Sequence, residues 1–438
     1  MHPAALAEPQ AAPADYIVES AHPRLLLNSH ELRRLCRDRD RGVSRWQRLQ
    51  AVLASEMDPP PEPGFAYALH YAVSGSLEHG RKAVEWALQD GSDPRQLALV
   101  FDWCHGILTE DELHQIAAKL RRFLEESGSD KSVQTVRSRV FAAVAASEQM
   151  RPLSAETLRA FFEDWWSNHY LPAVASGSQP AGREDLYALL EILHAFRDHF
   201  RIDLRTADRE FFTDLPLYSL LHYYPATHRT ATGEYHVPIG TAFANPDLRA
   251  AALARAADLS LATYDPNQLE CQFLQGWLMQ DQLQMRDAFG APYELLWANP
   301  YQPGLSYRSA PLSLHQPRFG ALYIRSSWNA DASCLFYRDG TARLLQGGVF
   351  RTLNLAGGGS LALGPAVVQP LPRKRKLEVD AEQPLTLYLL GAEPNAAYTI
   401  VVGEEKPLVK SAGAGGILAV PIPAGSQVKV KIAPAAGR

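Results

Sequence analysis

The feature that most constrains this chain is a change of hydrophobic period near residue 300. From about Ser44 to Met285, apolar residues recur at helical spacing in segments separated by short breaks. After residue 300 the sequence alternates, as in GALYIRSSWNADASCLFYRDG, which ends in the turn signal Asp339-Gly340. Because one element type cannot satisfy both periods, the sequence predicts a multidomain α+β chain.

The helical half reads as consecutive pairs of helices. A break at Ser74-Gly75-Ser76 divides one such pair, and Thr109 with Glu112 forms a capping box at the start of another helix. Helices joined by short loops lie antiparallel and must bury their apolar faces on each other, in an open solenoid or a closed ring. Aromatic-rich helix ends and a long polar loop over 226–245 favour a ring with a cleft on one face.

The second half reads as antiparallel β-sandwich. Strand patterns occur in ALYIRSSW, ASCLFYR, TARLLQ, VFRTLNL and SLALGPAVVQ, and then in LTLYLLG, AAYTIVVG, GILAVPIP and QVKVKIAP. We therefore predict helical hairpins over 21–299, a truncated β-sheet domain over 300–376 and a small β-sandwich over 377–438. The Pro/Ala-rich residues 1–20 are expected to be a disordered lead-in.

Composition excludes several functional classes. The 438-residue chain has a formal net charge of −5, so no global field would hold nucleic acid or an anionic membrane. No apolar run is long enough to span a membrane, and no secretory signal is visible. The four cysteines form no metal-binding spacing, and no P-loop or dinucleotide-binding motif occurs. We accordingly expect neither a metal nor a cofactor.

Three stretches resemble one family, the heparinase II/III-like polysaccharide lyases. They are HPRLLLNSHELRRL (22–35), LALVFDWCHGILTEDE (97–112) and FGALYIRSSWNADAS (319–333). The resemblance implies an (α/α) toroid followed by a β-sandwich, and eliminative cleavage of a uronic-acid polysaccharide. It also implies an acidic polysaccharide or oligosaccharide as partner, and a periplasmic or secreted location.

The chain departs from that family in its β domain. Relatives often carry a His-rich segment after these strands, whereas TARLLQGGVFRTLNLAGGGSLAL contains no histidine. Where relatives often place Asn-His at the start of a toroid helix, this chain has SVQTVRSRV. A divergent member is therefore implied, and an inactive carbohydrate-binding or assembly protein is the alternative hypothesis.

Polar side chains near helix ends are the first candidates for the site. Asn168 and His169 would neutralise a sugar carboxylate and relay a proton, unless they only cap a helix end. By the family resemblance, Tyr187 faces the cleft and would serve as proton shuttle. Arg183 would bind a carboxylate, unless it is an ordinary solvated charge of a first helical turn.

The long loop and a pair of tryptophans supply the other candidates. Tyr235 would be an alternative proton shuttle and His236 would assist it, unless the loop is only structured surface. Trp165 and Trp166 would stack on sugar rings, although aromatic residues at helical spacing are more often core. The adjacent residues Asp102 and Trp103 are predicted to hold helix ends together rather than to act in catalysis.

A basic run, RKRK over 373–376, precedes the last strand patterns. It is interpreted as a solvated loop or an edge strand that discourages strand pairing, with a polyanion-binding patch as the alternative. Exposed edges of the terminal β block would also allow self-association.

Overall fold

The computed structural model describes residues 21–55, 59–178, 182–183, 185–230, 233–240, 243–280, 287–354 and 359–435. These residues form two compact units, which we describe separately. The helical unit lies within Met1–Pro172, Pro180–Thr213 and Asp247–Leu305, and the β unit lies within Ala173–Gln179, Asp214–Pro246 and Ser306–Arg438. The predicted lead-in over 1–20 falls outside the described residues.

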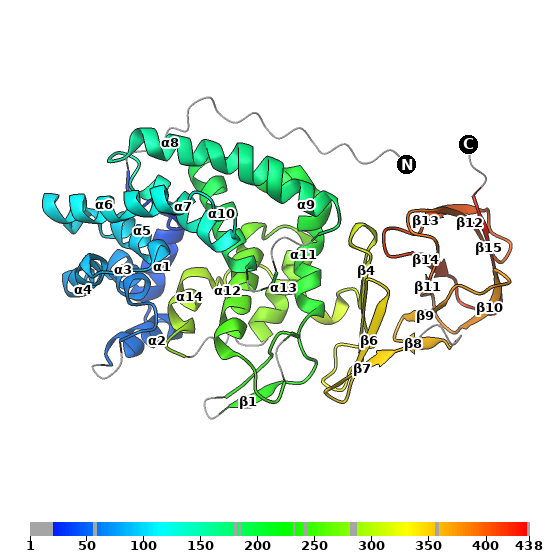
Figure 1. Cartoon of the computed structure of the whole chain (residues 1–438). Helices are drawn as coiled ribbons and strands as arrows, with labels where there is room; N and C mark the ends of the chain where they lie inside the picture. Colours follow the sequence, from blue (N-terminus) through cyan, green and yellow to red (C-terminus); the bar gives the residue numbers. More distant parts are fainter. Residues whose placement is uncertain are drawn as a thin grey trace. The chain divides into compact units, whose positions relative to one another are not determined.

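An inner ring of six helices organises the helical unit. Figure 1 labels these helices. Each inner helix packs against the next, and the last packs against the first, which closes the ring. Every residue of two of them, α10 and α14, is buried. The ring contains α3 (Pro63–Ser74), α5 (Pro94–Trp103), α7 (Val133–Ala145), α10 (Leu186–Ala195), α12 (Leu248–Tyr264) and α14 (Gly290–Trp297).

Amphipathic helices surround this ring. In α6 only one stripe of residues is buried, as expected for a helix with one face in water. The alternation of inner and outer helices confirms the predicted (α/α) toroid. The outer elements include α1 (Ser29–Asp40), α2 (Ser44–Leu53), α4 (Leu77–Leu88), α6 (Glu110–Glu126), α8 (Arg151–Ala160), the π-helix η2 (Phe161–Tyr170) and α13 (Leu269–Gln280). Shorter or connecting elements are η1 (His105–Ile107), α9 (Leu171–Ala175), η3 (Phe196–Phe200), η4 (Leu204–Asp208) and α11 (Arg209–Leu221).

Local signals in the sequence place the helix ends. Helix α3 ends where Gly75 adopts a left-handed conformation with φ of 74°, which glycine reaches without the penalty of a Cβ. At the start of α6, Thr109 and Glu112 form the predicted capping box. The predicted fastening role of Asp102 and Trp103 is also confirmed. The Asp102 carboxylate accepts from the backbone N–H groups of residues 24 and 25, and the Trp103 indole donates to the Leu25 carbonyl at 2.9 Å.

Three antiparallel-rich sheets make up most of the β unit. The first has the order β3-β4-β5-β6-β7, the second β14-β11-β9-β8 and the third β10-β15-β12-β13. The first contains β3 (Ser313–Gln316), β4 (Ala321–Arg325), β5 (Cys334–Arg338), β6 (Thr341–Gln346) and β7 (Val349–Leu353). The second contains β8 (Leu361–Leu363), β9 (Ala366–Pro370), β11 (Leu385–Leu390) and β14 (Ile417–Ile422). The third contains β10 (Lys376–Ala381), β12 (Ala397–Val402), β13 (Leu408–Ser411) and β15 (Gly425–Pro434). A small hairpin, β1 (His228–Thr230) and β2 (Gly233–Tyr235), and the single turns η5 (Tyr307–Ser309) and η6 (Pro317–Phe319) complete the unit.

The second sheet is the middle layer of this stack. In β11, Leu387 and Leu389 join the core shared with the third sheet, whereas Tyr388 and Leu390 join the core shared with the first. A strand buried on both faces has a nearly continuous apolar sequence, which explains LTLYLL. The pairing of β9 with β11 crosses residue 376, where the sequence predicted a division between two β domains.

Some strands differ from the predicted pattern. The stretch SLALGPAVVQ forms two paired strands, β8 and β9, because Gly364 turns the chain with φ of 52°. Strands β3 and β13 were not among the predicted strand patterns. Among the described helices, none has both the length and the apolar character needed to cross a membrane.

Candidate functional site

Four predicted site residues lie on the π-helix η2, and two of them line one cavity. Trp165 and Asn168 line a cavity of about 300 Å³, which we call the η2 pocket. Trp166 is buried and stacks on Tyr170 at 4.9 Å, so its ring faces are covered by packing. His169 is exposed, with its ring centroid 6.5 Å from that of Trp165.

The other wall of the η2 pocket comes from the α6–α7 connection and from α7. It contributes two cations, Lys131 and Arg139, and the carboxylate of Asp130. The indole of Trp165 donates to the Lys131 carbonyl at 2.9 Å, which ties the two walls together. The ring of Trp165 is 4% exposed, so a ligand would meet only its edge.

The two cations of the η2 pocket have no carboxylate partner. Within the described residues, neither Lys131 nor Arg139 forms an ion pair, and partial burial lowers the pKa of Arg139. The nearby Asp130 carboxylate accepts from Thr135 Oγ1 at 2.6 Å and from the Ser132 N–H at 2.8 Å, and these bonds lower its pKa. Hydrogen bonding thus engages Asp130. The exposed Asp164 also lines the pocket, so a ligand there meets two cations and two carboxylates, and neither cation is ion-paired within the described residues.

Tyr187 lies at a different place, in a buried polar cluster of the inner ring. We call this the ring-centre cluster: Glu62, Arg95, Arg137, Tyr187, Glu191 and Tyr293. The Glu191 carboxylate accepts from Arg95 Nη2 at 2.6 Å and from Arg137 Nη1 at 2.7 Å. Tyr293 donates to Glu62, whose carboxylate lies 3.4 Å from Arg95 Nη1. Two guanidinium groups therefore face two carboxylates.

The electrostatics of the ring-centre cluster keep Tyr187 protonated. Burial raises its pKa well above the ordinary value, and the charge of Glu191 raises it further. Its oxygen accepts from the Trp297 indole at 2.9 Å and from Arg95 Nη2 at 3.4 Å. Burial alone would raise the pKa of Glu191, but the two guanidinium groups outweigh it and lower that pKa. Near neutral pH, Tyr187 is therefore a proton donor rather than a base.

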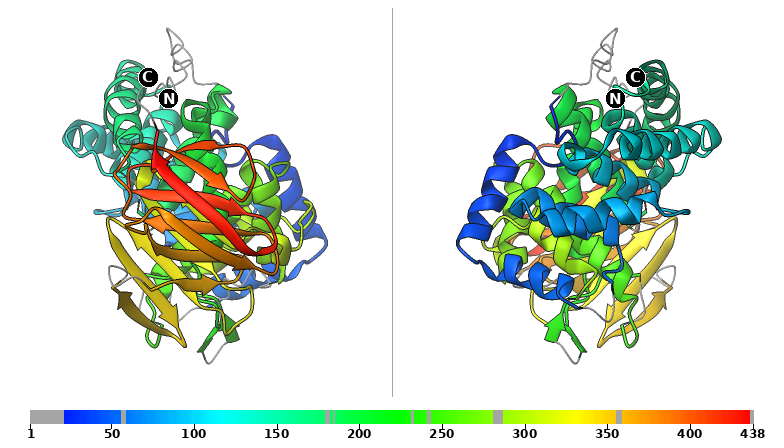
Figure 2. Two further views of the ribbon diagram at one scale, coloured as in Figure 1. Left: turned by 90° about the vertical axis from the view of Figure 1, so that its right-hand side faces the viewer. Right: turned by 90° about the vertical axis from the view of Figure 1, so that its left-hand side faces the viewer.

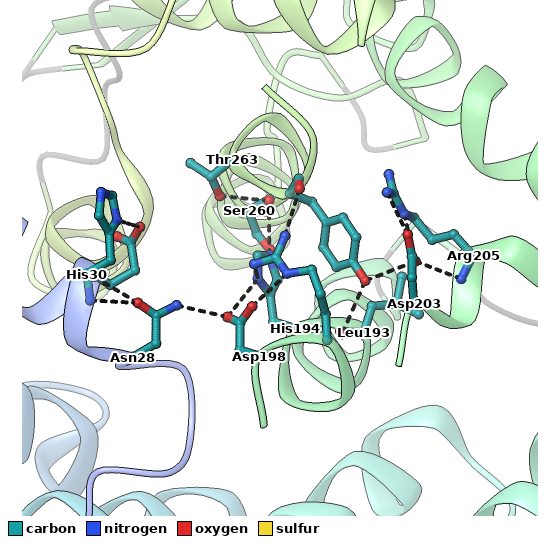
Figure 3. Close-up of polar contacts among 12 residues, drawn as sticks. Asn28, His30, Leu193, His194, Asp198, Asp203, Arg205, Ser260 and Thr263 are labelled. Atoms are coloured by element: carbon teal, nitrogen blue, oxygen red, sulfur yellow. Dashed lines mark hydrogen bonds and ion pairs between the residues drawn. The ribbon is translucent and has the colours of Figure 1, made fainter. Parts of the chain in front are cut away.

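A second polar chain continues from this cluster through Trp297 to His194. Figure 3 shows the part of it around His194. The ring of His194 lies 4.5 Å from that of Trp297, and its Nε2 is 3.1 Å from the Ser260 carbonyl. Its Nδ1 is 3.0 Å from Arg197 Nη2. Because arginine only donates and a carbonyl only accepts, His194 is the neutral Nε2–H tautomer. Burial lowers its pKa in agreement with this state.

The same chain reaches the start of the helical unit. Asp198 accepts from Arg197 Nε at 2.6 Å and from Asn28 Nδ2 at 3.3 Å (Figure 3). The Oδ1 atom of Asn28 accepts from the N–H groups of His30 and Glu31 and so caps the start of α1. Further along, Tyr264 donates to Asp203, and the Arg197 and Arg205 guanidinium groups lie 4.1 and 4.2 Å from its ring centroid. These contacts join several helices. The charge of Arg197 is balanced by Asp198, and that of Arg205 by Asp203.

The remaining predicted residues are not among those that line the η2 pocket. Arg183 Nη2 is 3.8 Å from Oδ2 of the buried Asp258. A substrate carboxylate would therefore compete with Asp258 for the Arg183 guanidinium group. Tyr235 and His236 belong to the β unit. The backbone of Tyr235 pairs with His228 in the β1–β2 hairpin, and its side chain lies outside the described part of the chain. His236 Nδ1 lies 3.2 Å from the Tyr224 carbonyl.

Sequence reasoning missed the cations of the η2 pocket and most of the ring-centre cluster. One available signal was Glu191, a single acidic residue inside the otherwise apolar run LYALLEILHA. A charge at such a position must be paired when it is buried, so it predicts a buried partner. No comparable signal pointed to Arg139, because it is one of two arginines in SVQTVRSRV and the spacing does not set it apart. Among the described residues, no three His, Cys, Asp or Glu side chains converge as metal ligands.

Comparisons with known proteins give only distant structural likenesses. No family model and no curated protein matches the chain. Solved structures that overlap it include a glycoside hydrolase, with TM-score 0.27, 11% identity, and coverage of 85% of this chain and 71% of the other. A GH127 β-L-arabinofuranosidase from Geobacillus stearothermophilus T6 has TM-score 0.24 at 11% identity, covering 92% and 74%. A further GH127 β-arabinofuranosidase has TM-score 0.18 at 10% identity, covering 92% and 77%.

At these TM-scores the overlap carries no argument about chemistry. The heparinase II/III-like resemblance likewise stays a likeness of short stretches, since no family model supports it. What the chain does must be argued from its own side chains.

Proposed function

We propose that this protein recognises an acidic glycan, and that the η2 pocket binds one of its sugar residues. The observation that carries the proposal is the meeting of Lys131 and Arg139 with Trp165 and Asn168 around one cavity. Two of these four residues were predicted from sequence, and the other two add the positive charge that a uronate requires.

Each side chain has a definite task in this proposal. A guanidinium group can bind both oxygens of a carboxylate, so Arg139 would orient the uronate while Lys131 adds an adjustable point charge. The Asn168 amide already donates to the Glu163 carbonyl, which leaves its oxygen to accept from a sugar hydroxyl. The edge of Trp165 would contact the sugar ring. The size of the cavity suits one monosaccharide unit of a longer chain.

Eliminative cleavage is a separate candidate, with Tyr187 as its proton donor. Cleavage requires neutralisation of the carboxylate, removal of the C5 proton and protonation of the leaving oxygen. The raised pKa of Tyr187 suits the last of these tasks. One observation argues against cleavage in this cluster. Arg95 and Arg137 already form ion pairs with Glu191, so little of their positive charge is left to neutralise a uronate carboxylate. Tyr235 stays the alternative proton shuttle, and His169 and His236 stay the proposed assistants.

Binding is tested by calorimetry with short oligogalacturonates. The Arg139→Met variant should bind at least tenfold more weakly than the parent protein, because a charge-assisted bidentate contact is lost. The matched control is Arg151→Met, an exposed arginine at the start of α8 that lines no part of the pocket. Equal affinity of the two variants would refute the proposed pocket.

Cleavage is tested by the far-ultraviolet absorbance of the unsaturated product. Product formation that is lost in Tyr187→Phe but kept in Tyr235→Phe would assign the proton donor to the ring-centre cluster. Saturable binding without product would leave recognition as the function. Absence of both binding and product would remove acidic glycans as the ligand class.

A further inference from the structure

The third sheet of the β unit carries a cluster of positive side chains on its outer face. We call it the lysine face: Arg373, Lys374, Lys376, Lys429 and Lys431. The left view of Figure 2 looks onto the C-terminal strands, with β15 in red crossing the front. All five residues are exposed, although the chain as a whole has a net charge of −5.

Strand register brings together basic residues that are far apart in sequence. Lys376 of β10 lies directly opposite Lys431 of β15, and Glu378 lies opposite Lys429. Between them, Val379 and Val430 are buried, so the lysines project from the opposite, outer face. The Ile432 N–H donates to the Arg375 carbonyl at 2.9 Å, which fixes the basic run beside β15.

This arrangement has an energetic cost. Within the described residues, none of the five cations forms an ion pair. Like charges directly opposite each other in antiparallel strands are destabilising. Glu378 lies opposite Lys429, and the exposed Asp380 follows it on β10, where its carboxylate accepts from the Gln427 N–H at 2.7 Å. Five cations against these two carboxylates leave the face net positive.

Protection of a sheet edge explains only part of the lysine face. β10 is an edge strand, and lysine on an edge discourages pairing with other chains, as predicted for the basic run. β15, however, lies between β10 and β12. Because β15 is not an edge strand, protection of an edge does not explain why Lys429 and Lys431 lie beside the residues of β10.

We propose that the lysine face binds an acidic polysaccharide chain. Cations about 5 Å apart across strands and about 7 Å apart along them match a polymer with closely spaced anionic groups. Around them the outer face presents small or aliphatic residues such as Thr399 and Val401. Single-stranded nucleic acid usually stacks its bases on aromatic rings, and the described residues of this face supply none. The choice of a glycan rests on the function proposed above, and the site is a second one, independent of the η2 pocket.

The test uses long polygalacturonate and the Lys429→Gln/Lys431→Gln double variant. We expect about a tenfold loss of affinity at low salt. We also expect the plot of log K against log salt concentration to be shallower by about one to two units, because two charges no longer displace counterions. The control is Lys406→Gln, a lysine in the loop between β12 and β13. An unchanged melting temperature shows that the double variant folds.

Different probes separate this site from the η2 pocket. Binding of a galacturonate tetrasaccharide should respond to Arg139→Met and not to the double lysine variant, whereas the long polymer should respond to both. A double variant that binds the polymer as well as Lys406→Gln would overturn the proposal. Tighter binding of duplex DNA than of polygalacturonate at the same salt concentration would assign the face to nucleic acid and overturn it as well.

Discussion

The two units of this protein bury their interiors in different ways. The helical ring places charged groups at its centre, with Arg95 and Glu191 at 3% and 0% exposure of their side chains. The β unit instead fills its middle layer with aliphatic and aromatic side chains, and its lysines stand outside. Stability in the ring thus depends on matched charges, whereas in the β unit it depends on packed volume. The comparison predicts which substitutions each unit tolerates.

The largest expected effect comes from removing one charge from the ring-centre cluster. Glu191→Gln keeps the side-chain shape but leaves Arg95 and Arg137 with less negative charge, and breaking a buried ion pair costs about 3–5 kcal/mol. The matched change in the β unit is Glu378→Gln on the exposed face of β10, which should alter the free energy of unfolding by less than about 0.5 kcal/mol. Denaturant unfolding of both variants measures the difference. Equal stabilities would contradict a ring held by matched charges.

Packed volume in the β unit is tested with one residue type at two sites. Val420 in β14 is 1% exposed within the core, and Val409 in β13 is 67% exposed. Truncation of Val420 to alanine should cost about 2 kcal/mol through lost burial and a small cavity, while Val409→Ala should cost less than about 0.5 kcal/mol. A Val420→Ala variant as stable as Val409→Ala would show that the β stack is loosely packed.

His70 in the helical unit and His315 in the β unit have strongly lowered pKa values that should make each unit sensitive to acid. Burial, with the nearby His79 charge, lowers the pKa of His70 to about 4, and burial with Lys410 lowers that of His315 to about 4. An unfolded histidine titrates near 6.5 and binds the proton first. Stability is therefore complete above about pH 6.5 and is lost as pH falls toward 4, by about 1–2 kcal/mol per residue after allowance for solvent screening.

Single variants divide this acid sensitivity between the units. His70→Asn should reduce the pH dependence of the helical unit's unfolding between pH 4.5 and 7, and His315→Asn that of the β unit. Tryptophan fluorescence and far-ultraviolet circular dichroism follow the two transitions. A pH profile left unchanged by both variants would show that other groups control the acid response.

Much of the fold was predictable from sequence because it follows from local signals. The capping box at Thr109, the turn at Gly75 and the alternation in most strands each act over a few residues, and the structure agrees with them. Strand β13 and the two-stranded form of β8 and β9 escaped prediction, since short strands carry little periodicity. The π-helical form of η2 had no sequence signal.

The candidate site was predictable only in part, for a physical reason. Trp165 and Asn168 are three residues apart on one helical element, so their shared face follows from spacing. Arg139 joins them from another helix, and Lys431 joins Lys376 from another strand, through tertiary contacts that one sequence does not reveal. The role of Tyr187 also depends on Glu191, which the same helix carries, but the partners Arg95 and Arg137 come from other helices and are not visible in that stretch.

Hydrogen exchange of the full chain with and without a galacturonate tetrasaccharide tests the central claim most directly. If the η2 pocket binds the sugar, slower exchange should be confined to the start of α7 near Lys131 and to η2 near Asn168, and Arg139→Met should abolish it. Protection elsewhere in the helical unit, or protection that survives in Arg139→Met, would contradict the account.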